Sequence, residues 1–120
     1  MNEKIKDFKD LKIWQKSMEI VMDIYNITKT FPREETYGIT SQMRRSAVSI
    51  PSNIAEGFKR HHNKEYKQFL YIALGSSAEL ETHLILAENL KYVTKKTAES
   101  IYENMDHLSR MITTLRKKLD

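Results

Sequence analysis

The chain has 120 residues, which suits one compact domain and leaves too few apolar side chains for a second core. Its 20 Lys and Arg outnumber its 16 Asp and Glu, a net charge of +4 that does not by itself define a polyanion-binding protein. Without cysteine there is no disulfide or thiolate chemistry, and without a long apolar run no membrane span or secretory leader, which favours a cytoplasmic protein.

Apolar residues recur at intervals of three and four, which predicts an all-helical chain. The first predicted helix spans about residues 11–29, with Asp10 as its N-cap and Pro32 beyond its end. Its expected core face consists of Leu11, Trp14, Met18, Val21, Met22 and Tyr25. A second apolar flank of the same helix would then consist of Ile13, Ile20 and Ile27.

The second predicted helix spans about residues 39–60 and contains Pro51 in its interior. We expect a kink there, because proline lacks a backbone N–H and its ring disturbs the preceding turn. The expected core face consists of Met43, Ala47, Ile50, Ile54 and Phe58. A separate apolar flank contains Val48 and Ala55.

Two further helices are predicted at about residues 64–91 and 95–118, with Asn63 and Thr94 as their N-caps. Short connections favour antiparallel neighbours, so we expect a single up-down-up-down four-helix bundle over residues 1–120. The expected core of the third helix consists of Tyr66, Phe69, Leu70, Ala73, Ser77, Leu80, Leu84 and Ala87. That of the fourth consists of Ile101, Met105, Leu108, Ile112, Leu115 and Leu119.

The third predicted helix is apolar around most of its circumference, and residues 69–78 contain no charge. A helix of this kind must be buried on more than one side, which predicts self-association. The alternative is that these side chains lie on the surface, as many apolar atoms do in any protein. The residues expected in an oligomer interface are Arg44, Val48, Ala55, Tyr71, Leu74, Gly75, Ala78 and Ile85.

Basic residues are concentrated between residues 40 and 70, where six of them face two acidic residues. Phosphate groups are recognised by such side chains, so we predict nucleic-acid contacts for Arg45, Lys59, Arg60, Lys64 and Lys67. The alternative is a solvated helix face with local Glu partners. Tyrosines at positions 37, 66 and 71 are assigned to the core or to interfaces rather than to base stacking.

The chain offers no catalytic or metal-binding pattern that we recognise. His61, His62 and Glu65 lie among Lys and Arg, which repel a cation, so a metal site is not expected. There is no Glu-x-x-His pattern of di-iron bundles, no Arg followed four to six residues later by His, and no Gly-x-Ser-x-Gly motif. We therefore expect no cofactor and no enzymatic activity.

Three runs, at residues 10–17, 31–38 and 49–57, occur in the order typical of one family. They include Trp14-Gln15-Lys16 and Asn53-Ile54-Ala55-Glu56-Gly57, and residues 42–47 and 75–82 fit as well. Over roughly residues 8–119 the chain thus resembles the 23S ribosomal RNA intervening-sequence proteins. The resemblance implies a four-helix bundle that assembles into a homopentameric ring. It also implies similarity to the accessory protein of diversity-generating retroelements, a basic pentamer that works with a reverse transcriptase and nucleic acid.

Neither resemblance implies a known reaction, and the location of such genes inside ribosomal RNA genes does not prove what the protein binds. The expected function is a non-catalytic homo-oligomeric scaffold that binds nucleic acid, with ribosomal or other structured RNA favoured. The alternative is an assembly hub that recruits a reverse transcriptase or another protein without touching nucleic acid.

Overall fold

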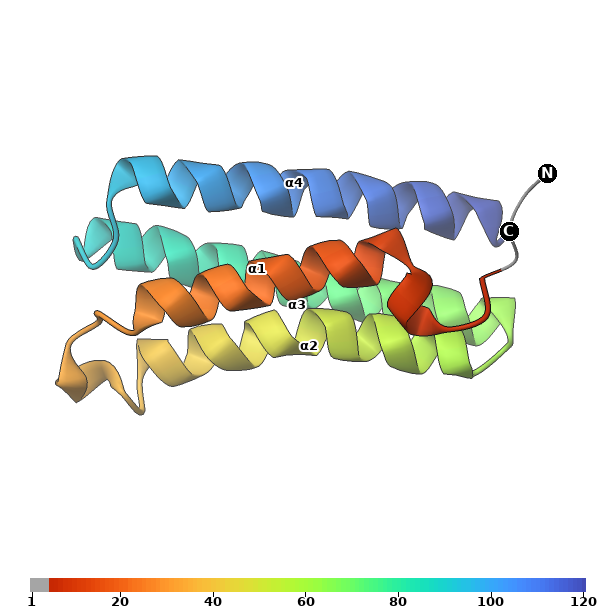
Figure 1. The fold of residues 1–120 in the computed structure, drawn as a ribbon, viewed down its shortest axis with the longest axis horizontal. Coiled ribbons are helices and arrows are strands. Elements are labelled where there is room, and N and C mark those ends of the chain that lie inside the picture. The colour runs from red at the N-terminus through yellow and green to blue at the C-terminus, as the bar shows by residue number, and fades with distance from the viewer. Residues whose placement is uncertain (1–4) are drawn as a thin grey trace.

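The structure is a computed structural model that describes residues 5–120, and within this range it contains helices and no strand. Four long helices lie along the 48 Å axis, and successive helices are joined at alternate ends of the bundle (Figure 1). They are α1 (Lys12–Thr28), α2 (Ile39–Lys59), α3 (Asn63–Asn89) and α4 (Lys95–Lys118). Two short 3-10 helices, η1 (Phe8–Asp10) and η2 (Arg33–Glu35), precede α1 and α2. The predicted all-α fold of four helices is confirmed.

Each helix contacts the next one along the chain, and α4 contacts α1, whereas the described parts of α1 and α3, or of α2 and α4, make no backbone contact. The helices therefore occupy the corners of a square, with α1 diagonally opposite α3. α2 and α3 pack tightly against each other at Gly57. A Cβ atom on Gly57 would lie 2.7 Å from Cβ of Phe69 and 3.1 Å from a ring atom of Tyr66.

The core runs through the centre of the square and takes apolar side chains from all four helices. The predicted core faces of α2, α3 and α4 are confirmed in the middle of the bundle. The exceptions lie toward the bundle ends, where four predicted core residues are only partly buried: Phe58, Phe69, Leu115 and Leu119. The largest fully buried apolar side chains are Ile20, Ile24, Met43, Ile50, Ile54, Leu70, Leu80, Leu84, Met105, Leu108 and Ile112.

The predicted core face of α1 is wrong by part of a turn. The buried residues are Ile13, Ser17, Ile20, Val21, Ile24 and Thr28, whereas Met18 and Met22 are 36% and 57% exposed. Ser17 and Thr28 can lie in the core because their hydroxyls donate to backbone carbonyls of α1, to Trp14 and Ile24 respectively, each at 2.7 Å. A pattern that counts only apolar residues misses this face, because two of its core positions are polar. Met18 and Met22, which that pattern placed in the core, lie on the surface.

One of the three predicted helix caps is confirmed. The Thr94 hydroxyl accepts the N–H of Thr97 at the start of α4. The other two are wrong, because Leu11 precedes α1 and His62 precedes α3, neither with a side-chain cap. Asp10 cannot cap α1, since it belongs to η1, whose N-cap is Asp7.

Pro51 lies inside α2, which continues through it as one helix, and the kink predicted there stays a prediction. Polar side chains around this point join α2 to α3. The Ser49 and Ser76 hydroxyls are 2.8 Å apart, and the Asn53 amide donates to Ser49 at both its carbonyl (2.8 Å) and its hydroxyl (3.0 Å). These bonds allow serine and asparagine to sit at a helix contact. None of the described helices is long and apolar enough to span a membrane.

Candidate functional site

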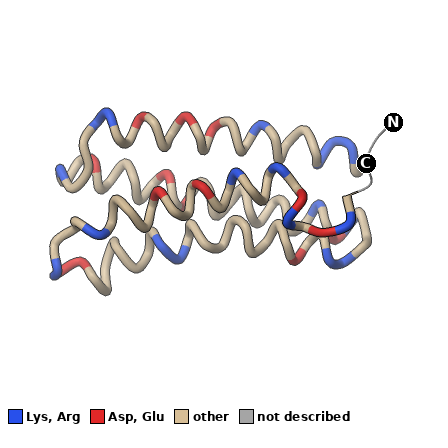
Figure 2. The backbone as a smooth tube through the Cα atoms, viewed as in Figure 1, with Lys and Arg blue, Asp and Glu red and all other residues tan. Residues whose placement is uncertain are grey.

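One end of the bundle collects basic residues from three separate parts of the chain. The start of α1, the α2–α3 connection and the end of α4 all lie at this end (Figure 1), and Figure 2 shows Lys and Arg there on each of them. We call this region the basic end. Its residues are Lys6, Lys9, Lys12, Lys59, Arg60, Lys64, Lys67, Arg116, Lys117 and Lys118. The accompanying acids are Asp7, Asp10, Glu56, Glu65 and Asp120.

Two of the predicted phosphate-binding residues already have carboxylate partners. The Arg60 guanidinium lies 3.2 Å from Glu56 and 3.6 Å from Glu65, and it covers the ring of Phe69. Lys67 is paired with Asp120 next to the end of α4. That contact lowers the pKa of Asp120, mainly because the Lys67 ammonium donates a hydrogen bond to its carboxylate. Both basic groups are thus partly neutralised within the chain.

Lys59 and Lys64, unlike Arg60 and Lys67, have no ion-pair partner among residues 5–120. Both are exposed, and among residues 5–120 neither has a carboxylate within ion-pair distance. Their charges are therefore available to an external anion. Of the four residues at this end that were predicted to contact phosphate, these two have the environment that such a role requires.

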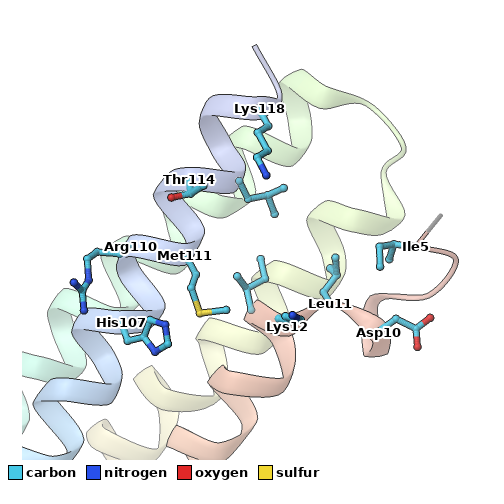
Figure 3. A pocket seen from close by; sticks show the side chains of 11 residues that line it. Ile5, Asp10, Leu11, Lys12, His107, Arg110, Met111, Thr114 and Lys118 are labelled. Atoms are coloured by element: carbon cyan, nitrogen blue, oxygen red, sulfur yellow. The ribbon is translucent and has the colours of Figure 1, made fainter. Parts of the chain in front are cut away.

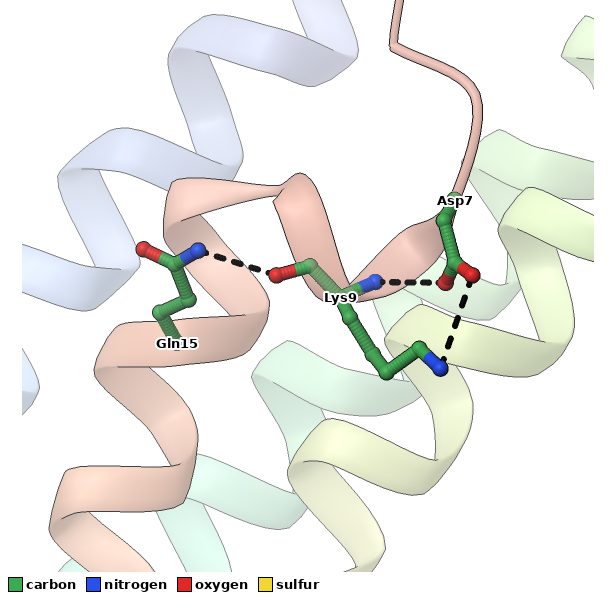
Figure 4. Close-up of polar contacts among 3 residues, drawn as sticks. All are labelled: Asp7, Lys9 and Gln15. Atoms are coloured by element: carbon green, nitrogen blue, oxygen red, sulfur yellow. Dashed lines mark hydrogen bonds and ion pairs between the residues drawn. The ribbon is translucent and has the colours of Figure 1, made fainter.

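The segment before α1 is held against the basic end by the contacts in Figure 4. The Asp7 carboxylate accepts the backbone N–H of Lys9 at 2.9 Å and pairs with the Lys9 ammonium at 3.6 Å. The Gln15 side chain donates to the Lys9 carbonyl at 2.9 Å. The Lys9 N–H lowers the pKa of Asp7 most, and the charges of Lys9 and Lys59 lower it further. One carboxylate therefore stays ionised beside the lysines.

The α2–α3 connection turns at His61, whose φ of 59° is in the left-handed region, and His61 and His62 are both exposed. No cluster of three or more His, Asp or Glu side chains that suits a metal ion occurs in the part of the chain that the structure describes.

Arg45 does not belong to the basic end. It precedes Lys59 by fourteen residues of α2, which is about 21 Å along a helix axis at 1.5 Å per residue. It is exposed, near the α1–α2 connection. Its neighbour Arg44 is engaged within the chain, because its Nε donates to the Thr28 hydroxyl at 2.9 Å and its guanidinium lies 4.7 Å from the Tyr25 ring centroid. The interface role predicted for Arg44 stays a prediction.

The other predicted interface residues lie on the surface to different degrees. Exposed ones are Val48, Tyr71, Gly75, Ala78 and Ile85, whereas Ala55 and Leu74 are half-buried. Ile72 and Leu86, which periodicity also placed off the core face of α3, are exposed as well. Sequence reasoning missed the exposed Met18 and Met22 on α1 and Leu90 next to α3. Those on α1 were missed because its core face was misplaced.

An open pocket of about 770 Å³ lies between the start of α1 and the end of α4 (Figure 3). Leu11, Ile13, Met111 and Leu115 give it an aliphatic lining, and Lys12, His107, Arg110 and Lys118 also line it. Such a cavity can hold an apolar group next to cations. Periodicity within one helix gives no signal for it, because its residues come from opposite ends of the chain.

The fold defines a small four-helix-bundle protein, with basic residues gathered at the end of the bundle where α2 joins α3. The sequence of residues 9–114 matches the 23S rRNA-intervening sequence protein family, and the chain belongs to this family. The resemblance seen in the sequence is thereby confirmed.

A solved structure supports the same assignment. The chain is similar to a crystal structure from the S23 ribosomal protein family, a protein of unknown function from Bacteroides thetaiotaomicron, with a TM-score of 0.80 and 27% identity. The match covers 88% of this chain and 98% of that one. No curated protein shows significant similarity to this sequence.

Proposed function

We propose that this chain forms a non-catalytic homopentameric ring whose basic ends bind the phosphate backbone of nucleic acid, with structured RNA as the favoured partner. The observation that carries this proposal is the gathering of basic side chains at one end of the bundle. Lys59 and Lys64 contribute most, because neither has a carboxylate of the described chain within ion-pair distance. Arg60 and Lys67 contribute after exchanging their carboxylate partners for phosphate.

Two different apolar faces support the assembly. The α1–α2 face contains the exposed Met18, Met22 and Val48, next to a shallow groove lined in part by Trp14, Pro51 and Ala55. The α3 face contains Tyr71, Ile72, Ile85 and Leu86, on the helix diagonally opposite α1. Two unlike patches on one subunit favour head-to-tail contacts, which generate a closed ring when the rotation between subunits divides a full turn. The number five comes from the family resemblance.

A ring strengthens the electrostatic argument. Cyclic symmetry places every copy of the basic end at the same height along the ring axis, so a modest cluster is repeated once per subunit. A polyanion that spans several subunits releases counterions at each contact, and the affinity then depends steeply on salt. Phosphate contacts of this kind give little base specificity.

The experiment is fluorescence anisotropy with a labelled structured RNA and with duplex DNA, each at two salt concentrations. We expect binding that weakens steeply as salt rises, with RNA bound at least as tightly as DNA. Analytical ultracentrifugation of the same sample should give five chain masses. No binding even at low salt would contradict the nucleic-acid proposal and would favour the assembly hub, for which the apolar cavity between α1 and α4 offers a docking position.

A further inference from the structure

A second pocket, about 480 Å³, lies where the α1–α2 connection meets the start of α2. It uses none of the basic-end residues. Its lining is unusually rich in groups that recognise phosphate and flat rings, with two arginines, two tyrosines and three hydroxyls. The residues are Tyr25, Thr36, Tyr37, Thr40, Ser41, Arg44, Arg45 and Val48.

The two arginines differ in how they are held. Arg44 is fixed by its hydrogen bond to Thr28 and by its position over the Tyr25 ring, so its charge is placed in advance at the pocket wall. Arg45 is exposed, and among residues 5–120 its side chain makes no hydrogen bond or ion pair. A fixed cation beside an adjustable one suits an anion that needs two guanidinium groups.

The start of α2 adds donors on the same side. Gly38 precedes the helix and provides no side-chain cap, so the first backbone N–H groups are left for an external acceptor. Thr40 is only 7% exposed yet lines the pocket, and its hydroxyl has no hydrogen-bond partner within the described residues. Thr40 and Ser41 precede Arg44 and Arg45 by four residues each, which is about one helical turn, so hydroxyls and guanidinium groups share a face.

Among the large hydrophobic side chains of residues 5–120, Tyr37 is the most exposed, at 95%. It was expected in the core or an interface, and within this chain it is not in the core. An aromatic ring that lines a pocket with both faces open to solvent is available for stacking on a nucleobase. The competing carboxylate is that of Glu35, whose Oε2 accepts a hydrogen bond from the Tyr92 hydroxyl at 2.8 Å. Its Oε1 lies beside Gly38, 2.7 Å from the position of a Cβ atom there, so a bound phosphate must displace this oxygen from the start of α2.

We propose that this pocket binds a nucleotide through a phosphate monoester and its base. The phosphate contacts Arg45, Arg44 and the uncapped start of α2, and the base stacks on Tyr37. A monoester carries close to two negative charges, which matches two guanidinium groups better than the single charge of a phosphodiester within a chain. The ligand is therefore a free nucleoside monophosphate or the 5′-phosphorylated end of an oligonucleotide. The inference does not depend on nucleic-acid binding at the basic end, because it uses none of those residues; Val48 is shared with the α1–α2 face.

Isothermal titration calorimetry with AMP, adenosine and inorganic phosphate tests the site. We expect AMP to bind, and adenosine and inorganic phosphate to bind at least roughly tenfold more weakly. Arg45→Gln should lower AMP affinity to that of adenosine. Tyr37→Ala should lower it to that of phosphate, and Tyr37→Phe should retain it, because stacking needs only the ring.

Lys59→Gln, at the basic end, is the matched control and should leave AMP binding unchanged. No heat with millimolar AMP would overturn the proposal. An unchanged affinity in Arg45→Gln, with the helical circular dichroism spectrum intact, would overturn it too, as would an equal loss in Lys59→Gln.

Competition against AMP separates the two sources of ligand. One short oligonucleotide is prepared with a 5′ phosphate and with a 5′ hydroxyl, and both forms are added to a Lys59→Gln, Lys64→Gln variant that lacks the main charges of the basic end. Competition by the phosphorylated form alone supports recognition of a chain end, and competition by neither supports a free nucleotide. Equal competition by both forms would overturn the monoester assignment.

Discussion

Arg116 on α4 lies across the ring of Tyr71 on α3. Its Nη1 donates to the Tyr71 hydroxyl at 2.6 Å, and its Cζ lies 4.4 Å from the ring centroid. Tyr71 is nevertheless 54% exposed, so an aromatic ring is held in one orientation on the outer surface of the bundle. A side chain fixed before binding loses less conformational entropy when a partner covers it. The α3 face is therefore arranged for contact rather than merely uncovered.

The first prediction concerns this face. Ile85→Glu places a charge beside Leu86 on the α3 face, where burial against another subunit would leave it without a partner. We expect the variant to sediment as a monomer while its helical spectrum is retained, because Ile85 is 45% exposed within one chain. The measurement is sedimentation velocity. Ser100→Glu, on the exposed surface of α4, is the control and should keep the wild-type mass. An unchanged mass for Ile85→Glu would remove the α3 face from the interface.

The second prediction tests the basic end with a matched charge change. Lys59→Glu with Lys64→Glu should raise the dissociation constant for RNA at least about tenfold and flatten its salt dependence, because phosphate contacts are lost. Lys95→Glu with Lys96→Glu makes the same change in net charge at the start of α4, at the opposite end of the bundle, and should have a much smaller effect. The readout is anisotropy at two salt concentrations. Equal losses in both variants would mean that net charge alone governs binding.

The third prediction contrasts two glycines. Gly57→Ala puts its methyl group 2.7 Å from Cβ of Phe69, an atom close to the backbone that cannot move away alone, so α2 and α3 must separate. We expect a loss of about 1–3 kcal/mol in the free energy of unfolding. A Cβ on Gly75 meets nothing within 4 Å, so Gly75→Ala should gain up to about 1 kcal/mol from helix propensity. Urea denaturation measures both. A stabilising Gly57→Ala would contradict the close α2–α3 contact.

The sequence predicts three of the four core faces. The core faces of α2, α3 and α4 follow from apolar periodicity, because their buried positions are nearly all apolar. The face of α1 does not, because Ser17 and Thr28 satisfy their hydroxyls on their own helix and take core positions. The prediction that Asp10 caps α1 was also wrong, because Asp10 belongs to a 3-10 helix that precedes α1. No local sequence rule predicted this 3-10 helix.

The sequence predicted which residue types form the site, but not which of them are paired with carboxylates. Charge density pointed to the α2–α3 connection, and Lys59 lies there with its charge available. The pairing of Lys67 with Asp120 joins residues far apart in the chain, so only the folded structure reveals that this cation is partly neutralised. Apolar periodicity placed Tyr66 on the core face of α3, where it is buried, whereas Tyr37 lies between helices, where periodicity gives no signal.

The fourth prediction concerns Tyr66, whose hydroxyl is buried and has no hydrogen-bond partner among the described residues. Burial raises its pKa from 10.0 to about 12, because the ionised form is poorly solvated. The folded state thus favours the neutral phenol, and the resulting stability is fully present below pH 10 and is lost as the pH rises toward 12. Tyr66→Phe should therefore weaken the alkaline decline of the unfolding free energy.

At pH 7 the same substitution removes a hydroxyl that gains nothing from burial, so stability should be unchanged or higher by about 1 kcal/mol. Thermal denaturation at pH 7 and at pH 11 measures both effects. Tyr25→Phe is the matched control, because it removes one tyrosine hydroxyl from a half-buried ring at the edge of the core. A clear loss of stability in Tyr66→Phe at pH 7 would mean that the hydroxyl has a partner, such as an internal water molecule or a neighbouring subunit.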